Sequence, residues 1–263
     1  MRGTILEKII DAKRKRVDAA KRLMGEAALA DQAYLTRADA TPHRFREAIA
    51  DSARVNIIAE FKRASPSKGI INDHLDPAET AIAYEDAGAA AISVLTEEDF
   101  FKGSLEDLAA VRNAVNIPIL RKDFIIDDFQ IYESTAAGAD AVLLIVAGQS
   151  AENLQRLLRL AHELGLDAIV EVHDRGELET AISIGADIIG VNNRNLKTFE
   201  VSLDVSRELI KYKPKDVVMI TESGISGRAE INELRELGFN GFLIGEALMR
   251  SADAARELRL LTT

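Results

Sequence analysis

The stretch AGADAVLLIV at residues 137–146 carries the pattern that decides the fold of this chain. Gly138 suits the left-handed residue that ends a helix, and the apolar run after it lacks polar alternation, as in a strand covered on both faces. The pattern recurs as AGAAAISVL at 87–95, LGLDAIVEV at 164–172, IGADIIGVNN at 184–193 and LGFNGFLIG at 237–245. The repeat therefore predicts five buried parallel strands, each preceded by a helix.

Three further apolar runs complete the series: VNIIAEF at 55–61, IPILRKDF at 117–124 and VVMITES at 217–223. Helical segments lie between the strands, and several begin at Ser or Asp, which cap helix starts; they include 76–88, 104–115, 150–165 and 226–238. Eight strand–helix units predict an α/β fold, a (β/α)8 TIM barrel. A doubly wound open sheet is the alternative, but the lack of a G-x-G-x-x-G turn favours the barrel.

Length and composition limit the class of protein. We expect one barrel domain over residues 1–263, in which about 1–50 form a helical N-terminal extension with helices at 5–24, 26–35 and 45–50. The absence of cysteine excludes disulfides and thiolate chemistry. The N-terminus has no secretion signal, no apolar run reaches the roughly 20 residues of a membrane helix, and the formal net charge of −10 argues against nonspecific nucleic-acid binding. We therefore expect a cytoplasmic protein that binds neither membranes nor nucleic acids.

Charged side chains fall where the predicted strands end. Because strand side chains alternate between faces, Glu60 and Lys62 share a face with Ile58, and the same parity places four further polar residues on interior faces: Lys122, Glu171, Asn192 and Glu222. Barrel active sites lie at the carboxyl ends of the strands, so these groups form a ring at the top of the interior. A structural ring of salt bridges is the alternative. Five crowded ionisable groups exceed what closure needs, which favours acid/base chemistry.

Two glycines indicate a phosphate site at the same end of the barrel. Gly224 follows the seventh predicted strand and Gly245 the eighth, where a short helix beginning at 246 would offer free N–H groups to an anion. The polar loop 65–69 is suited to close over a substrate, and Arg194 to bind a carboxylate or phosphate. Each feature taken alone also fits a turn or a solvated loop. The histidines share no metal-ligand spacing, and we interpret them as surface or core residues: His43, His74, His162 and His173.

Seven segments in their order resemble the indole-3-glycerol phosphate synthase family: AEFKRASPSKG, SVLTEEDFFKGS, LRKDF, VEVH, GVNNRNL, TESGI and LIGEALM. The resemblance runs nearly end to end and includes the helical extension. It implies a carboxy-lyase of tryptophan biosynthesis that converts 1-(2-carboxyphenylamino)-1-deoxyribulose 5-phosphate to indole-3-glycerol phosphate by ring closure, decarboxylation and dehydration. It also implies an anionic sugar-phosphate substrate, with no cofactor and no metal.

The resemblance assigns a role to each candidate residue. Lys122 matches the general acid of ring closure, Glu171 the acid/base group of dehydration, and Lys62 a catalytic residue that contacts the anionic groups, including the phosphate. Glu60 matches the carboxylate beside Lys62, and Asn192 a polar group at the substrate. The other implied positions are substrate contacts at Ser65, Arg194, Glu222 and Ser223, aromatic walls at Phe101 and Phe124, and a phosphate cradle at Gly224 and Gly245. We expect the side chain of Glu246 to point away from the phosphate.

Two other functions fit the same barrel. One is a different sugar-phosphate reaction, such as an Amadori isomerisation, and the other is a phosphate-binding barrel without catalysis. The ring of two lysines and three glutamates argues against the first, since an isomerase commonly needs one acid and one base. The intact Lys62, Lys122 and Glu171 argue against the second. We expect the protein to be a monomer or a weak homodimer.

Overall fold

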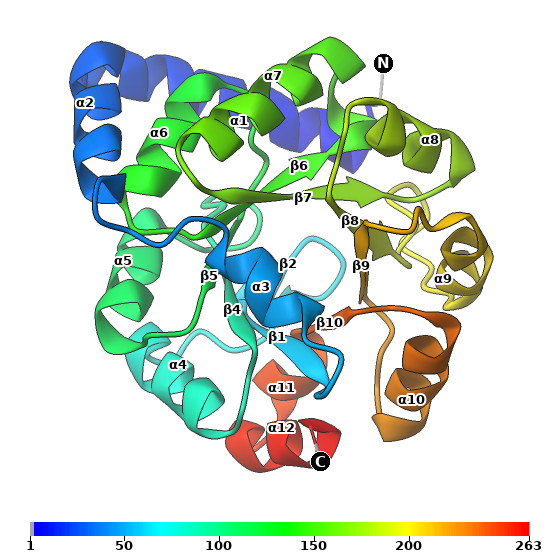
Figure 1. The fold of residues 1–263 in the computed structure, drawn as a ribbon. Coiled ribbons are helices and arrows are strands. Elements are labelled where there is room, and N and C mark those ends of the chain that lie inside the picture. Colours follow the sequence, from blue (N-terminus) through cyan, green and yellow to red (C-terminus); the bar gives the residue numbers. More distant parts are fainter. Residues whose placement is uncertain (1–2, 263) are drawn as a thin grey trace.

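The computed structural model describes residues 3–262 and shows a closed barrel of parallel strands (Figure 1). The strands lie around the barrel in the order β1–β10–β9–β8–β7–β6–β5–β4, so β1 pairs with both β4 and β10. Their bounds are β1 Asn56–Phe61, β4 Ala91–Leu95, β5 Ile119–Lys122, β6 Ala141–Ile145, β7 Asp167–Val172, β8 Ile188–Asn192, β9 Val218–Glu222 and β10 Gly241–Ile244. The predicted (β/α)8 TIM barrel is confirmed.

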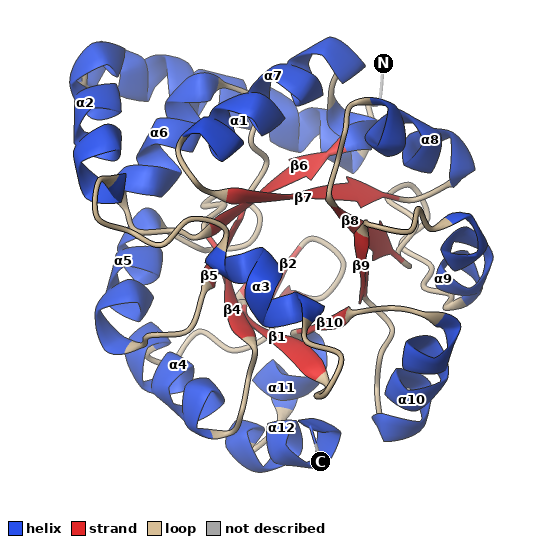
Figure 2. Ribbon diagram, in the orientation of Figure 1, coloured by secondary structure: helices blue, strands red, loops and turns tan. Residues whose placement is uncertain are grey.

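Helices surround the strands (Figure 2). They are α4 Pro77–Asp86, α5 Leu105–Ala114, α6 Asp128–Ala136, α7 Ala151–Glu163, α8 Arg175–Ser183, α9 Asp204–Leu209, α10 Arg228–Leu237, α11 Glu246–Arg250 and α12 Ala254–Thr262, with short 3-10 turns η1 Val146–Gly148 and η2 Ile210–Tyr212. A small hairpin, β2 Ala64–Ser65 and β3 Gly69–Ile70, follows β1. Within residues 3–262, no helix is both long and apolar enough to span a membrane.

The local signals that set the strand–helix repeat act as the sequence predicts. The side chains of Asp76, Ser104 and Ser150 each accept a hydrogen bond from a backbone N–H in the first turn of α4, α5 and α7. The repeated glycines all adopt positive φ, from 69° at Gly165 to 113° at Gly238, which ends the preceding helix without steric cost. One expectation is wrong in detail, because Gly227 and not Ser226 precedes α10.

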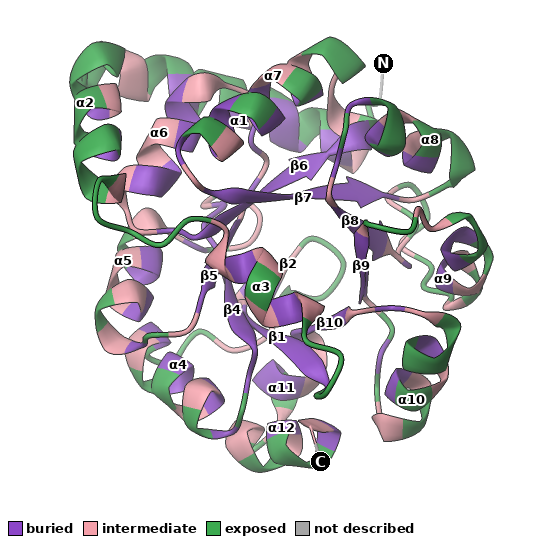
Figure 3. Ribbon diagram, viewed as in Figure 1, coloured by how far each residue is buried: buried purple, intermediate pink, exposed green. Residues whose placement is uncertain are grey.

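Apolar side chains fill two layers, one inside the barrel and one between the strands and the helices. The barrel strands are coloured almost entirely as buried in Figure 3. The interior layer includes the residues that parity placed there: Ile58, Leu120, Ile169, Ile188 and Ile220. Larger numbers of Val, Leu and Ala side chains point outward from the same strands onto the helices. This alternation is what brings the last inward residue of each strand to the carboxyl-terminal mouth of the barrel.

The three N-terminal helices touch both ends of the barrel. They are α1 Ile5–Leu23, α2 Glu26–Arg37 and α3 Arg44–Ala50. The side chains of Phe45 and Ile49 on α3 are fully buried and join the interior layer at the amino-terminal end of the strands. There the carboxylate of Asp167, the first residue of β7, accepts a hydrogen bond of 2.8 Å from the N–H of Arg46. Helix α2 packs on α6, and the start of α1 reaches the opposite mouth.

Candidate active site

Every residue that the sequence singled out as a candidate lines one cavity at the carboxyl ends of the strands. They are Glu60, Lys62, Ser65, Phe101, Lys122, Phe124, Glu171, Asn192, Arg194, Glu222, Ser223, Gly224 and Gly245. They come from the ends of seven different strands and the loops that follow them. The cavity lies at the end where barrel enzymes carry their catalytic residues.

Lys122 stands at the centre of the polar groups, between two carboxylates. Its Nζ lies 3.2 Å from Oε2 of Glu171 on β7 and forms a second ion pair with Glu222 on β9. Burial disfavours the charged forms of all three groups, but the two carboxylates together raise the pKa of Lys122 above its usual value. Lys122 and His173 in turn lower the pKa of Glu171. The cluster therefore holds one cation and at least one carboxylate out of water.

The second carboxylate of the cluster, Glu222, has a pKa shifted in the opposite direction to that of Glu171. Burial raises the pKa of Glu222 to about 7, because Lys122 offsets only part of the burial effect while Glu171 and Glu60 add repulsion. The two carboxylates that contact Lys122 therefore have pKa values shifted in opposite directions, and they titrate as a coupled pair.

Glycines make room for these carboxylates inside the barrel. A Cβ on Gly190 of β8 would lie 2.6 Å from Oε1 of Glu222, and a Cβ on Gly245 would lie 2.3 Å from Oε1 of Glu60. Any side chain at either position would displace a carboxylate. The glycine at 245 therefore has a structural cause, the ion pair of Glu60 with Lys62, besides the phosphate contact that the sequence suggested.

The mouth beside α11 gathers cations around Glu246. This residue lines the cavity, and its carboxylate lies 3.3 Å from Arg250, 3.9 Å from Arg194 and 3.9 Å from Lys68. The side chain that we expected to point away is thus held at the rim. Asn192 accepts a 3.0 Å hydrogen bond from the N–H of Arg194, which fixes the start of this loop.

The turn after β9 lines the cavity and has an unusual backbone conformation. Ser223 and Gly224 have φ values of 66° and 84°, so two successive residues are left-handed. Buried Asn193 holds the turn, because its amide donates hydrogen bonds of 3.0 Å to the carbonyls of Glu222 and Ser223. A non-glycine residue in this region is strained by about 1 kcal/mol or more and is common at ligand sites.

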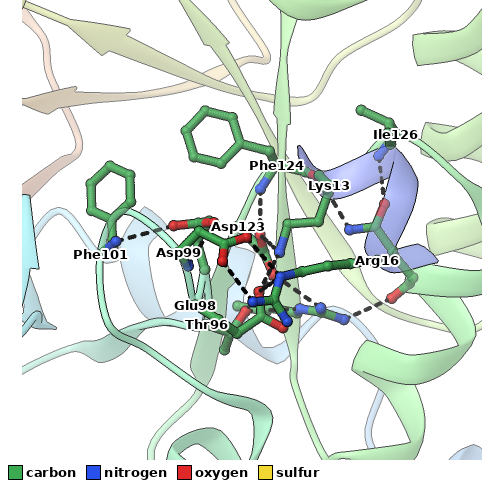
Figure 4. Close-up of polar contacts among 12 residues, drawn as sticks. Lys13, Arg16, Thr96, Glu98, Asp99, Phe101, Asp123, Phe124 and Ile126 are labelled. Atoms are coloured by element: carbon green, nitrogen blue, oxygen red, sulfur yellow. Dashed lines mark hydrogen bonds and ion pairs between the residues drawn. The ribbon is translucent and has the colours of Figure 1, made fainter. Parts of the chain in front are cut away.

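The aromatic wall is anchored to α1 through a buried ion cluster (Figure 4). The rings of Phe101 and Phe124 lie 6.0 Å apart, centre to centre. Lys13 of α1 reaches Asp123 at 2.8 Å and Glu98 at 3.0 Å. Asp123 also accepts a 2.8 Å hydrogen bond from the N–H of Phe124. Lys13 therefore ties α1 to the segment that carries Phe124 through Asp123, and to the segment that carries Phe101 through Glu98.

Loss of the Lys13 anchor should destabilise the protein. The side chain of Lys13 is 3% exposed and that of Asp123 is fully buried, and removing one partner of such a pair costs about 3 kcal/mol or more. We expect Lys13→Met to lower the free energy of unfolding by about that amount in urea denaturation. The matched control is Arg14→Met, which removes a neighbouring pair whose side chains are more than half exposed. Equal stability of the two variants would contradict the prediction.

Two features in and beside the cavity were not found from the sequence. The first is the contribution of α1, because Ile5, Leu6 and Ile9 line the cavity while their apolar spacing predicted only packing on the barrel. The second is His173, which we interpreted as an ordinary surface or core residue. Its Nε2 lies 3.3 Å from Oε1 of Glu171. The signal that was available is its place two residues after Glu171, at the end of a strand.

Comparisons with known proteins agree on one family. A family model described as indole-3-glycerol phosphate synthase matches residues 6–261. A protein of that name from Desulfosudis oleivorans is 47% identical over 266 residues, covering 98% of each chain. The one from Neisseria meningitidis serogroup B is 47% identical over 258 residues, covering 97% of each chain, and the one from Carboxydothermus hydrogenoformans is 45% identical over 260 residues, covering 97% of this chain and 98% of that one.

Solved structures share the fold at lower identity. The 3-hexulose-6-phosphate synthase from Salmonella typhimurium aligns with a TM-score of 0.63 and 18% identity over 79% of this chain and 96% of that chain. The N-acetylmannosamine-6-phosphate 2-epimerase from Clostridium perfringens aligns with a TM-score of 0.57 and 18% identity over 73% of this chain and 86% of that chain. At such identities the likeness establishes the barrel alone.

Proposed function

Since this chain belongs to the indole-3-glycerol phosphate synthase family, it is a decarboxylating lyase of that class, and we propose that its reaction takes place at the Lys122–Glu171–Glu222 cluster. The observation that carries the proposal is the position of Lys122, whose Nζ contacts carboxylates from two other strands inside one cavity. Variants of Lys122 and Glu171, assayed with the anthranilate-derived ribulose phosphate for indole fluorescence, test it.

Ring closure needs a proton at the substrate ketone. The ring carbon that bears the carboxylate attacks the ketone carbon, and the ketone oxygen takes a proton as its π electrons move onto it. Lys122 is the donor in this proposal: burial disfavours its charge, but the carboxylates of Glu222 and Glu171 outweigh burial, raise the pKa of Lys122 and keep it protonated. Its charge also stabilises the oxygen as negative charge develops. The carboxylate then leaves as CO2, and the bond electrons restore the aromatic ring.

Dehydration needs both an acid and a base. The new hydroxyl leaves as water with a proton, and a C–H proton is lost as the indole double bond forms. Glu171 is the acid/base residue of this step, and the lowered pKa of its carboxyl keeps it ionised, so that it is available to accept the C–H proton. Glu222, with a pKa of about 7, supports it as a proton-carrying neighbour.

The substrate is held at its two ends. We place the anthranilate ring against Phe101 and Phe124, and the phosphate at the backbone of Ser223–Gly224 and Gly245, near Lys62. The first N–H groups of α11 have no acceptor within their helix, which favours an anion there. We place Glu60, paired with Lys62, and the amide of Asn192 between the two ends of the substrate, and Ser65 and Arg194 at the rim; all four residues line the cavity.

The phosphate position predicts an unusual gain of affinity. Glu246 repels an anion at this rim and holds Arg194 and Lys68, so Glu246→Ser should free both cations for the phosphate. We expect a KM about threefold lower and tighter inhibition by inorganic phosphate, as for the loss of a weak surface repulsion. The control is Glu47→Ser, which makes the same charge change at an exposed residue of α3, at the other end of the barrel. An unchanged or higher KM for Glu246→Ser argues against the phosphate site.

Three further properties are proposals. We propose that residues 1–263 form one domain with the extension at about 1–50, because α3 packs into the interior and α1 lines the cavity. The unfolding curves of Lys13→Met by circular dichroism and by activity should then coincide. We also propose a monomer or weak homodimer, which light scattering tests, and a cytoplasmic location in keeping with the family, which cell fractionation tests.

A further inference from the structure

His173 holds the far side of Glu171. It follows β7 at the turn into α8, and its Nδ1 lies 3.0 Å from Oε2 of Glu177 while its Nε2 lies 3.3 Å from Oε1 of Glu171. The backbone N–H of His173 donates to the same Glu177 oxygen at 2.8 Å. The imidazole is thus held by its hydrogen bond to Glu177 and lies at ion-pair distance from Glu171, with no hydrogen bond from Nε2 to that carboxylate. The other oxygen of Glu171 lies 3.2 Å from the amino group of Lys122.

The histidine lies outside the reaction cavity. His173 lines a neighbouring groove between the start of α1 and the loop after β8, whereas Glu171 lines the cavity itself. The side chain of His173 is 13% exposed and that of Glu171 is 4% exposed. Because His173 lines the groove and Glu171 the cavity, we expect the histidine to affect the reaction through the carboxylate.

We propose that His173 is a positioning residue for Glu171: as an imidazolium it keeps this carboxylate ionised and pairs with its Oε1, so that Oε2 alone faces Lys122 and the substrate. The inference rests on the proposed acid/base role of Glu171. Restraining one oxygen matters because a base must present its lone pair at hydrogen-bond distance from the proton that it removes. Second partners of this kind fix the orientation of catalytic groups elsewhere.

The surrounding charges agree with a protonated imidazole. On the cavity side, Glu171 shares its surroundings with Lys122, Glu222 and Glu60. Beside His173 lie Asp174 and Glu177, and across the groove the charged residues of α1 are Glu7, Lys8, Asp11 and Arg14. The loop after β8 adds Arg194, Lys197 and Glu200. Burial opposes the cation, but the carboxylates of Glu171 and Glu177 raise the pKa of His173 to about 10.

The sign of the expected pH effect follows from this charge. A cation at 3.3 Å favours the ionised form of Glu171, so its removal raises the pKa of that carboxyl. As the pH falls, Glu171 then becomes protonated, and stops acting as a base, at a higher pH than in the wild type. In His173→Gln the acid limb of the kcat–pH profile should move upward by about one unit, with kcat about tenfold lower on that limb and close to wild type at alkaline pH. The KM should change less than twofold, since His173 lies outside the cavity.

A matched control separates positioning from structure. His162→Gln also removes a half-buried histidine beside an aspartate, 3.6 Å from Asp187, and should leave the profile in place. Glu177→Gln keeps the imidazole but removes one anchor, and should shift the limb in the same direction by less. If His173→Gln does not fold, this second variant decides.

Three outcomes overturn the inference. The first is a kcat of His173→Gln that falls by the same factor at every pH. The second is a lower melting temperature of His173→Gln with an unchanged kcat–pH profile. The third is an unshifted acid limb in Glu177→Gln, if that is the only variant that folds. The proposed acid/base role of Glu171, on which the inference rests, is tested separately with Glu171→Gln. Loss of dehydration in that variant with an unmoved limb in His173→Gln refutes the positioning role alone, whereas full dehydration by Glu171→Gln refutes the proposed function as well.

Discussion

Lys122→Ala is expected to stay folded and to lower kcat/KM for indole formation by at least about 10³-fold, since a positioned acid contributes about 10² to 10⁴ and its charge stabilises the developing oxyanion as well. The chain should stay folded because Glu171 and Glu222 can take up protons when their cation is removed, and because most of the interior layer is unaffected. Indole fluorescence measures the turnover, and circular dichroism measures the fold.

Two further variants complete this test. Lys122→Met keeps the volume of the side chain and separates the loss of the amino group from the cavity that alanine leaves. Lys213→Met is the matched control, because Lys213 is also partly buried and donates to Gly238 and Asn240 at 2.7 Å and 2.6 Å, far from the cavity. It should lose stability and keep its kcat. Turnover by Lys122→Met within tenfold of wild type removes Lys122 from the mechanism.

Glu171→Gln should separate two products that normally appear together. Ring closure and loss of CO2 depend on Lys122, whereas removal of the C–H proton depends on Glu171. We therefore expect indole formation to fall by at least about 10²-fold while CO2 is still released in a single turnover. Quenched reactions analysed for both products measure the two yields.

The control for this variant is Glu179→Gln on exposed α8, which should leave both yields unchanged. CO2 and indole that fall by the same factor would show that Glu171 acts before decarboxylation. Full yields of both would show that another group is the base. Either result changes the assignment of Glu171 without affecting that of Lys122.

Strand parity explains why so much of the cavity could be predicted from the sequence. In a closed parallel barrel, a residue two positions beyond an inward Ile or Leu also faces inward. When that residue is the last of its strand, it lies at the carboxyl-terminal mouth of the barrel. Glu60, Lys122, Glu171 and Glu222 all follow this rule and line one cavity, where Lys122 contacts Glu171 and Glu222. The prediction needed only local pattern and the known direction of the chain.

What could not be predicted depends on contacts between distant segments. Lys13 meets Asp123 from a helix whose spacing shows an apolar face but not where on the barrel that face lies. Gly190 is needed because Glu222 of the next strand occupies the space beside it. His173 resembles any polar residue in a turn until the register of β7 brings its ring to Glu171.

The placement of α3 sets an order of events during synthesis. This helix precedes every strand of the barrel, yet its side chains fill the end formed jointly by β1, β4, β7 and β9. A nascent chain therefore carries Phe45 and Ile49 without their full set of packing partners until β9, which ends at residue 222, has left the ribosome. Strand β1 lacks its neighbour β10 for longer still. The exposed apolar surface during that interval is where a chaperone would bind, and it disappears only when the last strand arrives.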